Sequence, residues 1–401
     1  MTWEKVYLRD IADTCLGKML DQNKNKGDYC QYLANVNVRW GAFDLSDLPL
    51  MRFEANEQER YGLKYGDIVI CEGGEPGRCA IWKNQIPNMK IQKALHRVRV
   101  HPDMDYRYVY YWFLWAGRRG ALEQYFTGAT IKHMPGQKLK SVIIDKPPLE
   151  TQHRIADILS AYDDLIEVNQ KQIRLLEEAA RRLYREWFVA LRFPGHEDTP
   201  IIDGIPAGWS KTHISEICQM VSGGTPSTKV ESYYSNGSIP WVTPTDITQN
   251  KALFFLDTEK KITEDGLHHS SAKMVPAGTI LMTSRASVGY FGMCDFEVCT
   301  NQGFISCIPN QSNLQMFLLF NLKNRIGEIR QKAGGSTYLE IRKTTLGTFD
   351  ILIPSAPILQ LFQNITQSIF QKERSLLKTN KLLQEARDRL LPKLMNGEIE
   401  V

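Results

Sequence analysis

Short polar loops punctuated by glycine or proline are the parts of this sequence best suited to chemistry. In the second half of the chain they lie at residues 222–229, 243–246, 283–289 and 300–303, and they are rich in Thr, Ser, Asn, Gln and Arg. Glycine lets a ligand approach the backbone, and these side chains hydrogen-bond to phosphate oxygens and base edges. Such loops are suited to binding DNA, although each one alone is more often an ordinary capped turn.

Arg285 is the strongest single candidate for reading a base. A lone arginine in a Ser/Thr-rich turn can place two N–H groups on a guanine, whereas the alternative is pairing with a nearby carboxylate such as Asp295. The residues that we expect to face DNA in the second half are Thr225, Ser227, Lys229, Tyr233, Thr243, Thr245, Arg285, Asn301, Gln302, Thr337 and Arg342.

The first half carries a basic block in place of matching loops. Residues 78–146 hold 13 Lys or Arg against 4 Asp or Glu, although the net charge of the whole chain is only +4. This block predicts one electropositive face, as phosphate binding requires, and a solvated basic surface is the alternative. The candidate DNA contacts here are Arg39, Arg52, Arg78, Lys132 and His133.

Signatures of catalysis are missing from the sequence. It has no phosphate-binding P-loop, and residues 73–78 do not fit the G-x-G-x-x-G pattern. Asp246 with Glu259-Lys260-Lys261 resembles a nuclease triplet, but such triplets arise by chance and the first half has no counterpart. The eight cysteines lack metal-ligand spacing and are expected to be reduced core thiols. We therefore predict a chain that is not an enzyme, with no catalytic residues, no metal and no cofactor of its own.

The elements that must position these loops occur twice along the chain. Gly278 follows Gly66 by 212 residues, and both precede an apolar strand and a Gly-containing turn; helices are expected at 106–115 and 314–322. The repeat predicts an α+β (mixed α/β) fold with two homologous domains and pseudo-two-fold symmetry. A two-part ligand such as double-stranded DNA would match it.

A long helix is expected after each domain. Apolar residues step by four and three from Ile155 to Trp187, with only Asn169 breaking the stripe, and a weaker stripe runs from Phe362 through Ile365, Lys372 and Thr379 to Leu390. This spacing is typical of a coiled coil, here an antiparallel pair that would hold the domains apart and end at Pro392. In the alternative, each helix folds back on its own domain.

The expected division of the chain follows from these patterns. No apolar run is long enough for a membrane span and no secretory signal is visible, so a cytoplasmic location is expected. The expected segments are a first recognition domain (1–150), a first spacer helix (151–190), a linker (191–208), a second recognition domain (209–356), a second spacer helix (357–392) and a tail (393–401).

Several motifs in combination resemble the specificity subunits of type I restriction-modification systems. Two places depart from the family pattern: residues 354–360 lack the usual acidic residue before Gln360, and Cys15–Lys18 replaces a Gly-Gly-Thr-Pro motif. The motifs that carry the resemblance are Ser222–Ser227, Ile239–Pro244, Thr283–Gly289, Thr300–Phe304, Gly204–Trp209, Leu391–Ile399 and Pro147–Ile155.

The resemblance implies two target recognition domains that bind a bipartite, asymmetric DNA site and are separated by a two-helix spacer. It further implies two modification subunits, which carry S-adenosylmethionine and the adenine-methylating site, and restriction subunits that use ATP and Mg. A related methyltransferase or phage-defence assembly, an orphan non-catalytic DNA-binding scaffold, and a hidden nuclease are the alternatives. Helix residues available for partner subunits or spacer phosphates are Lys171, Arg174, Arg181, Arg182 and Arg185.

Overall fold

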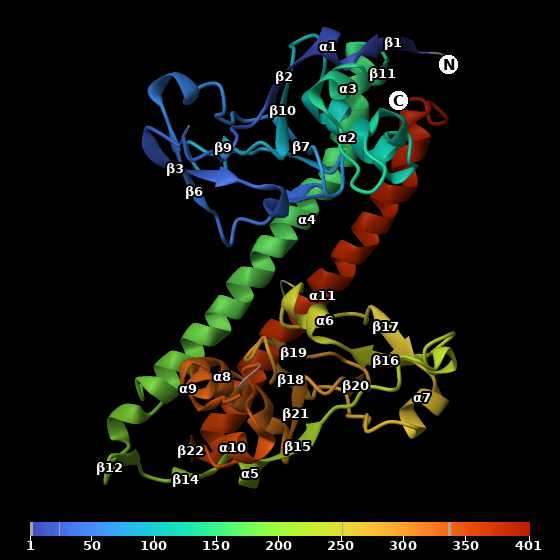
Figure 1. Ribbon diagram of the computed structural model, residues 1–401. Coiled ribbons are helices and arrows are strands. Elements are labelled where there is room, and N and C mark those ends of the chain that lie inside the picture. Colours follow the sequence, from blue (N-terminus) through green and yellow to red (C-terminus); the bar gives the residue numbers. More distant parts are fainter. Residues whose placement is uncertain (1–2, 24, 251, 336–337) are drawn as a thin grey trace. The chain divides into compact units, whose positions relative to one another are not determined.

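Two compact units make up the chain in a computed structural model, which describes residues 3–23, 25–250, 252–335 and 338–401 (Figure 1). Unit 1 comprises residues 1–166 and 383–401, and unit 2 comprises residues 167–382. Both combine small sheets with helices, which confirms the α+β prediction. Among the described residues, no helix is long and apolar enough to cross a membrane.

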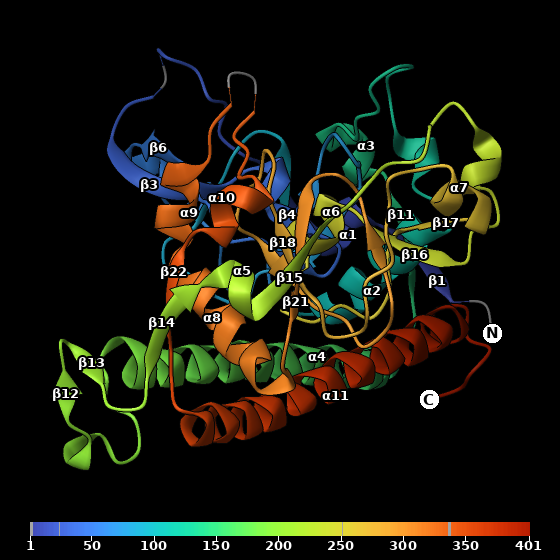
Figure 2. The same cartoon turned by 90° about the horizontal axis from the view of Figure 1, so that it is seen from below.

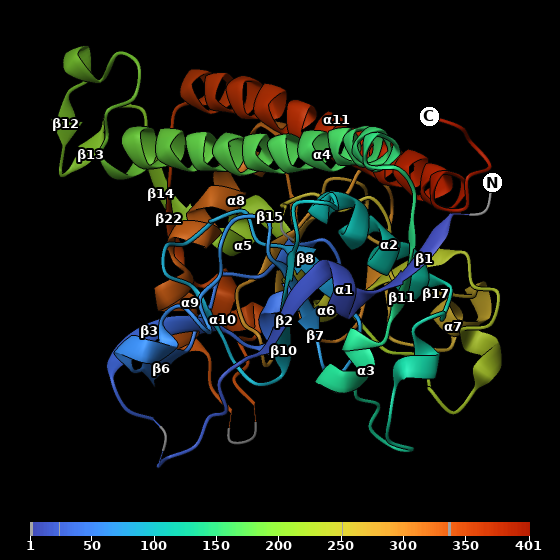
Figure 3. The ribbon, with the colours of Figure 1, turned by 90° about the horizontal axis from the view of Figure 1, so that it is seen from above.

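Unit 1 is built on an antiparallel sheet with the strand order β2-β10-β7-β8. Strand β7, with the sequence Ile-Val-Ile-Cys, is buried along its whole length, and α2 lies between this sheet and α4 (Figure 3). A second sheet has the order β6-β3-β9, and β1 pairs with β11. The elements are β1 (Glu4–Tyr7), α1 (Leu8–Ile11), β2 (Ala12–Leu16), β3 (Asp28–Leu33), β4 (Val38–Arg39), β5 (Ala42–Phe43), β6 (Leu50–Phe53), β7 (Ile68–Cys71), β8 (Cys79–Ile81), β9 (Lys90–Ile91), β10 (Leu95–Val100), α2 (Tyr106–Arg118), α3 (Gly136–Lys140) and β11 (Ile143–Lys146).

Unit 2 repeats this topology. Its main sheet has the order β15-β21-β18-β19, its second sheet β17-β16-β20, and β14 pairs with β22. Helix α8 lies between the main sheet and the helices α4 and α11 (Figure 2). The elements are β12 (Ile201–Ile202), β13 (Ile205–Pro206), β14 (Ser210–His213), α5 (Ile214–Ile217), β15 (Cys218–Ser222), β16 (Ile239–Val242), α6 (Pro244–Thr248), β17 (Lys260–Ile262), α7 (Glu264–His268), β18 (Ile280–Thr283), β19 (Phe291–Gly292), β20 (Cys299–Thr300), β21 (Phe304–Pro309), α8 (Gln315–Asn324), α9 (Ile326–Lys332), α10 (Lys343–Gly347) and β22 (Asp350–Ile353).

Two long helices, α4 (Leu149–Tyr184) and α11 (Ala356–Met395), contribute to both units. In unit 1, Ile155 and Leu159 of α4 share a core with Leu391 and Leu394 of α11. In unit 2, Ala180 and Tyr184 of α4 share a core with Leu359 and Phe362 of α11. Within each unit the early part of one helix therefore meets the late part of the other, which makes the pair antiparallel and excludes helices folded back separately.

The apolar stripe predicted on α4 is confirmed, because its positions from Leu159 to Trp187 are buried or half-buried. On α11 the predicted stripe is confirmed at its ends, Phe362 and Leu390, which are buried or half-buried, but it is wrong by one residue at three positions between them. Ile365 is 37% exposed, and Lys372 and Thr379 are also exposed. The buried positions are Thr366, Glu373 and Asn380.

Hydrogen bonds explain why polar side chains occupy the buried face of α11. The Thr366 hydroxyl donates to the carbonyl oxygen of Phe362 at 2.7 Å, and Glu373 accepts from the backbone N–H of Phe254 at 3.1 Å. Asn380 accepts from the amide of Asn169 at 2.8 Å. A buried polar group is tolerated when it is hydrogen-bonded, and apolar periodicity alone does not reveal such a position.

Helix α11 was expected to end at Pro392. It continues instead to Met395. A proline in the last turn removes one N–H donor, but its own carbonyl oxygen still accepts a bond. The N–H of Asn396 donates to that oxygen at 3.0 Å. Leu394 and Met395 are also fully buried in the core of unit 1, and this burial favours the additional turn.

Asn169 and Asn380 should contribute to the free energy of unfolding mainly through their mutual hydrogen bond, so that substitutions at the two positions are not additive. We expect Asn169→Leu to lower the free energy of unfolding by about 1–3 kcal/mol, because Asn380 then loses its partner inside the core. Adding Asn380→Leu should recover most of that loss. Thermal unfolding of the two single variants and the double variant measures the coupling. Gln170→Leu, at an exposed position of α4, is the control, and additive losses in the double variant would contradict the pairing.

Glu373 predicts a pH dependence of stability. Burial, followed by the charge of Glu177, raises the pKa of Glu373 from 4.5 to about 8. The folded protein then holds a proton that the unfolded chain releases above pH 4.5, so this group makes the fold less stable as the pH rises from 4.5 to 8. Glu373→Gln should therefore raise the melting temperature at pH 8 and leave it nearly unchanged at pH 4. The exposed Glu385→Gln should show no such difference between the two pH values.

Candidate nucleic-acid interface

Three polar loops that lie apart in the sequence of unit 2 are joined by backbone hydrogen bonds. The N–H of Ser284, in the turn between β18 and β19, donates to Gly303 at 2.7 Å. The N–H of Gly224, after β15, donates to Thr300 at 2.9 Å. Trp241 adds a side-chain bond from its indole N–H to the Gly224 carbonyl oxygen at 3.0 Å. The predicted loops therefore form one continuous surface.

A fourth segment, residues 338–343, completes this surface. The N–H of Ile341 donates to Ser284 at 2.9 Å, and the N–H of Ala286 donates to Leu339 at 2.9 Å. Within unit 2, the residues leading into and out of this segment lie on the side of the sheet away from α4 and α11 (Figure 2). A groove results, which we call the unit 2 groove, and it is lined by Ser222, Ser284, Gln302, Glu340, Arg342 and Lys343.

Arg285 is exposed and directly follows Ser284 of this groove. Ala286, next in sequence, has a φ of 60°, which turns the chain sharply behind the arginine. The Arg285 guanidinium lies 5.8 Å from the ring centroid of Tyr338, and no described carboxylate forms an ion pair with it. Asp295, its expected alternative partner, pairs with Arg374 at 3.3 Å. Arg285 therefore keeps its N–H donors available for a ligand.

The other predicted residues of unit 2 divide into available and engaged side chains. Gln302 accepts from the Thr225 hydroxyl, and both residues are exposed. The Asn301 side chain accepts from the N–H of Gly303 at 2.9 Å and so shapes the loop. The half-buried Tyr233 stacks on His269 with centroids 5.8 Å apart. Ser227, Lys229, Thr245 and Arg342 are exposed, and Thr337 lies outside the described residues.

Thr243 does not face a ligand. It is buried, and its hydroxyl donates to Asp246 at 2.7 Å while its backbone N–H donates to the same carboxylate at 2.8 Å. The other oxygen of Asp246 accepts from the N–H of Glu259 at 2.8 Å. Thr243 and Asp246 together cap α6, which gives the Thr-Pro-Thr-Asp sequence and Asp246 a structural role.

Unit 1 contains the same backbone arrangement with different side chains. The N–H of Glu72 donates to the carbonyl oxygen of Ala94 at 2.9 Å, which corresponds to the bond from Ser284 to Gly303. The N–H of Met134 donates to the carbonyl oxygen of Glu72 at 2.7 Å, which corresponds to the bond from Ile341 to Ser284. The side chain of Gln92 accepts from Ala94, as Asn301 does from Gly303. An isolated antiparallel β-bridge joins Gly73 to His133, and a matching β-bridge joins Arg285 to Glu340. By this correspondence, Gly73 occupies the place of Arg285, Lys93 that of Gln302, and His133 that of Glu340.

Lys93 is the residue of unit 1 that the sequence predictions missed. The two loops share only an amide residue followed two positions later by a small residue, Gln92-Lys93-Ala94 and Asn301-Gln302-Gly303. This signal is weak, and only the matched hydrogen bonds identify it. Lys93 is half-buried, and no hydrogen bond or ion pair joins its ammonium group to the described residues.

The five residues predicted in unit 1 are only partly brought together. His133 packs beside Gly73, and the exposed Lys132 lies next to it, 3.6 Å from Glu123. Their loop lies on the side of unit 1 away from α4 (Figure 3). Arg52 stacks on Tyr29, with 4.6 Å between the guanidinium carbon and the ring centroid. Only Lys132 and His133 belong to the loops that correspond to the unit 2 groove.

Arg78 and Arg39 serve the fold of unit 1. The half-buried guanidinium of Arg78 donates to Asn35 at 2.7 Å and pairs with Glu75 at 3.0 Å, which fixes the turn after β7. Arg39 donates to the carbonyl oxygen of Val38 at 3.1 Å and lies 3.7 Å from Asp44. In the same block, Arg97 is buried and donates to three carbonyl oxygens. The predicted electropositive face is thus weaker than the count of basic residues suggests.

The predicted partner-binding residues, four on α4 and Arg185 directly after it, are all exposed. Arg182 and Arg181 both pair with Glu178, at 2.7 and 2.6 Å, and these bonds hold the pKa of that carboxyl below its ordinary value. Lys171, Arg174 and Arg185 form no ion pair with the described residues. This part of α4 therefore presents cations that are available to a partner.

Most of the cysteine thiols lie in the interior of the two units. All eight cysteines are free, and six of them are buried. Burial raises the pKa of the Cys294 and Cys299 thiols to about 12, so these groups are protonated near neutral pH. Among the residues that the structure describes, no three His, Cys, Asp or Glu side chains gather as metal ligands would.

Comparison with known proteins gives a consistent result. The family model described as "Type I restriction modification DNA specificity domain" matches residues 1–178 and 206–386. The chain is 27% identical to the specificity subunit of the type I restriction enzyme HindI from Haemophilus influenzae, with 99% of each chain covered. It is 34% identical to the MjaIX specificity subunit from Methanocaldococcus jannaschii over 42% of this chain and 40% of that one.

A solved structure shows the same fold. The S subunit of a type I restriction-modification system from M. genitalium superposes with a TM-score of 0.56 at 18% identity, covering 98% of this chain and 96% of that one. The two family matches cover one repeat each, in agreement with the repeated topology of units 1 and 2. The chain therefore belongs to the family of type I restriction-modification DNA specificity subunits.

Proposed function

We propose that this chain is the sequence-specific DNA-recognition subunit of a type I restriction-modification complex, and that each unit binds one half of a bipartite, asymmetric site. The observation that carries the proposal is the repeated loop arrangement with different side chains at matched positions. Arg285, Gln302 and Glu340 in unit 2 correspond to Gly73, Lys93 and His133 in unit 1. One backbone frame with two sets of side chains is suited to two different half-sites.

The chain reads DNA and assembles partners in this proposal, and it does not itself catalyse a reaction. Two modification subunits would supply S-adenosylmethionine and methylate adenine, and restriction subunits would use ATP and Mg. The exposed cations of α4 support a role for that helix in binding those subunits or the phosphates between the half-sites. The complex would act in the cytoplasm, where the genome is accessible. The segments named above as recognition domains, spacer helices, linker and tail belong to the same proposal.

Two other functions remain as alternatives, and each has a direct test. A related methyltransferase or phage-defence assembly, or an orphan scaffold, differs in the partner that copurifies with the chain. A hidden nuclease would cleave DNA when the purified chain is incubated with Mg²⁺. The engagement of both Asp246 oxygens in backbone bonds favours a structural role for that residue.

Arg285 gives the first test of base reading. Single-molecule sequencing of methylated adenines in the host genome would identify the site. Arg285→Ala should then weaken binding to that site by about 5- to 150-fold, since a bidentate arginine–guanine contact is worth about 1–3 kcal/mol. It should also relax the preference at one base pair. Arg389→Ala, an exposed arginine of α11, is the matched control. Binding by Arg285→Ala within about twofold of wild type would remove Arg285 from the base contacts.

Lys93 gives a test of unit 1. If its ammonium group binds a phosphate, Lys93→Gln should reduce the slope of log K against log salt by about 0.9, because one fewer counterion is released on binding. Lys132→Gln should act in the same direction, whereas Lys381→Gln on the exposed face of α11 should not. A slope that stays unchanged in Lys93→Gln would show that the structural match to Gln302 has no counterpart in DNA binding.

A further inference from the structure

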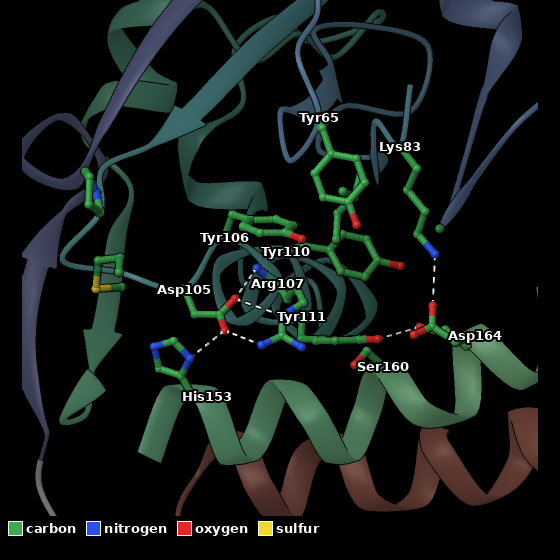
Figure 4. Close-up of a pocket in the computed structure, with 15 residues that line it drawn as sticks. Tyr65, Lys83, Asp105, Tyr106, Arg107, Tyr110, Tyr111, His153, Ser160 and Asp164 are labelled. Carbon is green, nitrogen blue, oxygen red and sulfur yellow. Dashed lines mark hydrogen bonds and ion pairs between the residues drawn. The ribbon is translucent and has the colours of Figure 1, made fainter. Parts of the chain in front are cut away.

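Unit 1 contains a second candidate site, away from the loops described above. An open pocket of about 400 Å³ lies between α2 and the first turns of α4 (Figure 4). This volume falls in the range of small-ligand sites and is large enough for a long side chain. We call it the tyrosine pocket; its lining includes Tyr65, Tyr106, Tyr110, Tyr111, Asp105, Asp163, Asp164, Lys83, Arg107 and His153.

Aromatic rings form one wall of the pocket. Tyr65 and Tyr106 meet edge to face with centroids 6.3 Å apart, and Tyr110 and Tyr111 lie 4.9 Å apart. Figure 4 shows the rings of Tyr65, Tyr106 and Tyr110 gathered on this wall. Tyr110 is only 3% exposed, yet its hydroxyl makes no hydrogen bond to a described residue. The side chain is buried but its hydroxyl is open to the pocket, so it can hydrogen-bond to a polar group of a ligand.

Three carboxylates belong to the lining, and each already has a basic partner. Asp105 is bound by Arg107 at 2.7 Å and lies 3.5 Å from His153, so its oxygens are occupied. Asp163 accepts from the Tyr111 hydroxyl at 2.7 Å and also pairs with Arg387. Asp164 pairs with Lys83 at 3.0 Å, but its side chain is 62% exposed. Asp164 is the most exposed of the three carboxylates, so it is the one that a cationic ligand can reach.

The corresponding place in unit 2 is already filled by the chain itself. Tyr106 lies over Gly66 as Gln315 lies over Gly278, so α2 corresponds to α8. There Leu253 and Phe254 run along the edge of β19, and Phe254 packs on Phe370 with centroids 5.9 Å apart. The guanidinium carbon of Arg374 lies 4.8 Å from the Phe254 ring centroid. Unit 2 therefore supplies both an aromatic ring and an arginine at this position.

Unit 1 has no side chain to insert at the equivalent edge. The N–H of Gly41 donates to Cys79 of β8 at 2.9 Å, and Gly41 has a φ of 75°. A β-carbon added to Gly41 would lie 2.7 Å from the Tyr110 hydroxyl, so any larger residue would cover that group. Glycine leaves the tyrosine pocket open, and the aromatic wall lacks the guanidinium that Arg374 provides in unit 2.

We propose that the tyrosine pocket binds an arginine side chain of a partner protein. A planar guanidinium can stack on tyrosine rings and donate to a carboxylate, here Asp164, and to the Tyr110 oxygen. The rim is suited to a protein surface, because Tyr65 is 59% exposed and Leu165, which follows Asp164 on α4, is 45% exposed. The proposed site lies within unit 1, and the inference does not depend on the proposed DNA contacts.

The test uses the full chain with ¹³C-labelled tyrosines and small probes observed by NMR. N-acetyl-L-arginine amide should shift the signals of Tyr65, Tyr106 and Tyr110 with a dissociation constant of about 1 mM, a weak affinity expected for a single side chain. Its neutral isostere, N-acetyl-L-citrulline amide, should bind at least about fivefold more weakly, because the cation–π and carboxylate contacts need the charge. The tripeptide acetyl-Ala-Arg-Ala-amide should bind as tightly as the arginine probe.

Variants separate a binding role from a structural one. Lys83→Gln should tighten binding of the arginine probe severalfold by removing a competing cation, whereas Asp164→Asn should weaken it. Ser160→Phe, which places a ring in the pocket lining, should abolish the shifts, and Ser368→Phe on an exposed turn of α11 should not. Tyr110→Phe keeps the ring and should weaken binding modestly. Circular dichroism of each variant checks the fold.

Three results would overturn the proposal. Equal binding of the citrulline and arginine probes would show that charge is not recognised. Shifts that persist in Ser160→Phe would place the probe elsewhere on the chain. Weaker binding of the tripeptide than of the free probe would indicate a pocket for a small molecule instead of a protein side chain. If Ser160→Phe does not fold, the opposite effects of Lys83→Gln and Asp164→Asn decide the question.

Discussion

The antiparallel contact between α4 and α11 is the constraint on which both units depend. Neither helix can bury its apolar face alone, and each unit places its sheet and one shorter helix against parts of both. Unit 1 contains residues 1–166 together with 383–401, so its core requires the last residues of the chain to return to the first. Leu391, Leu394 and Met395 are fully buried there. Loss of the final two turns of α11 would expose a core and not merely a terminus.

Polar groups inside this contact give it a register. Asn169 pairs with Asn380, and Glu177 and Glu373 accept from the neighbouring N–H groups of Leu253 and Phe254. A slip of either helix by one residue would leave these groups buried without partners, which costs more than the loss of an apolar contact. A buried asparagine is known to fix the register of coiled coils in this way. The helix pair thus holds the segment at 253–254 within unit 2. That segment fills the place in unit 2 that corresponds to the open tyrosine pocket of unit 1.

The two units share one backbone frame and differ in the side chains that it carries. Backbone bonds between the turn after β18, the loop before β21 and the segment at 338–343 recur in unit 1 with the same partners. The side chains at matched positions differ in charge and size, as with Arg285 and Gly73. The same divergence leaves the tyrosine pocket open in unit 1 and filled by Phe254 in unit 2. Conserved backbone bonds keep the loops in place while the exposed positions change.

The repeat, the α+β class, the long helices and the polar loops of the second half could be predicted from the sequence, because local periodicity and turn residues specify these features. The sequence also identified Arg285 as an exposed arginine of the turn. Folding was needed to show that α11 buries Glu373 and Asn380, since their hydrogen-bond partners lie far away in sequence. Distant partners also explain why Arg78, which donates to Asn35, proved to be engaged within the fold and why Lys93 was missed. Thr366 and Thr243 bond to neighbours within four residues, and only the burial of these two threonines depends on the fold. The type of a side chain shows which hydrogen bonds and ion pairs it can form. Whether those bonds are already made within the protein depends on neighbours that are brought together by folding.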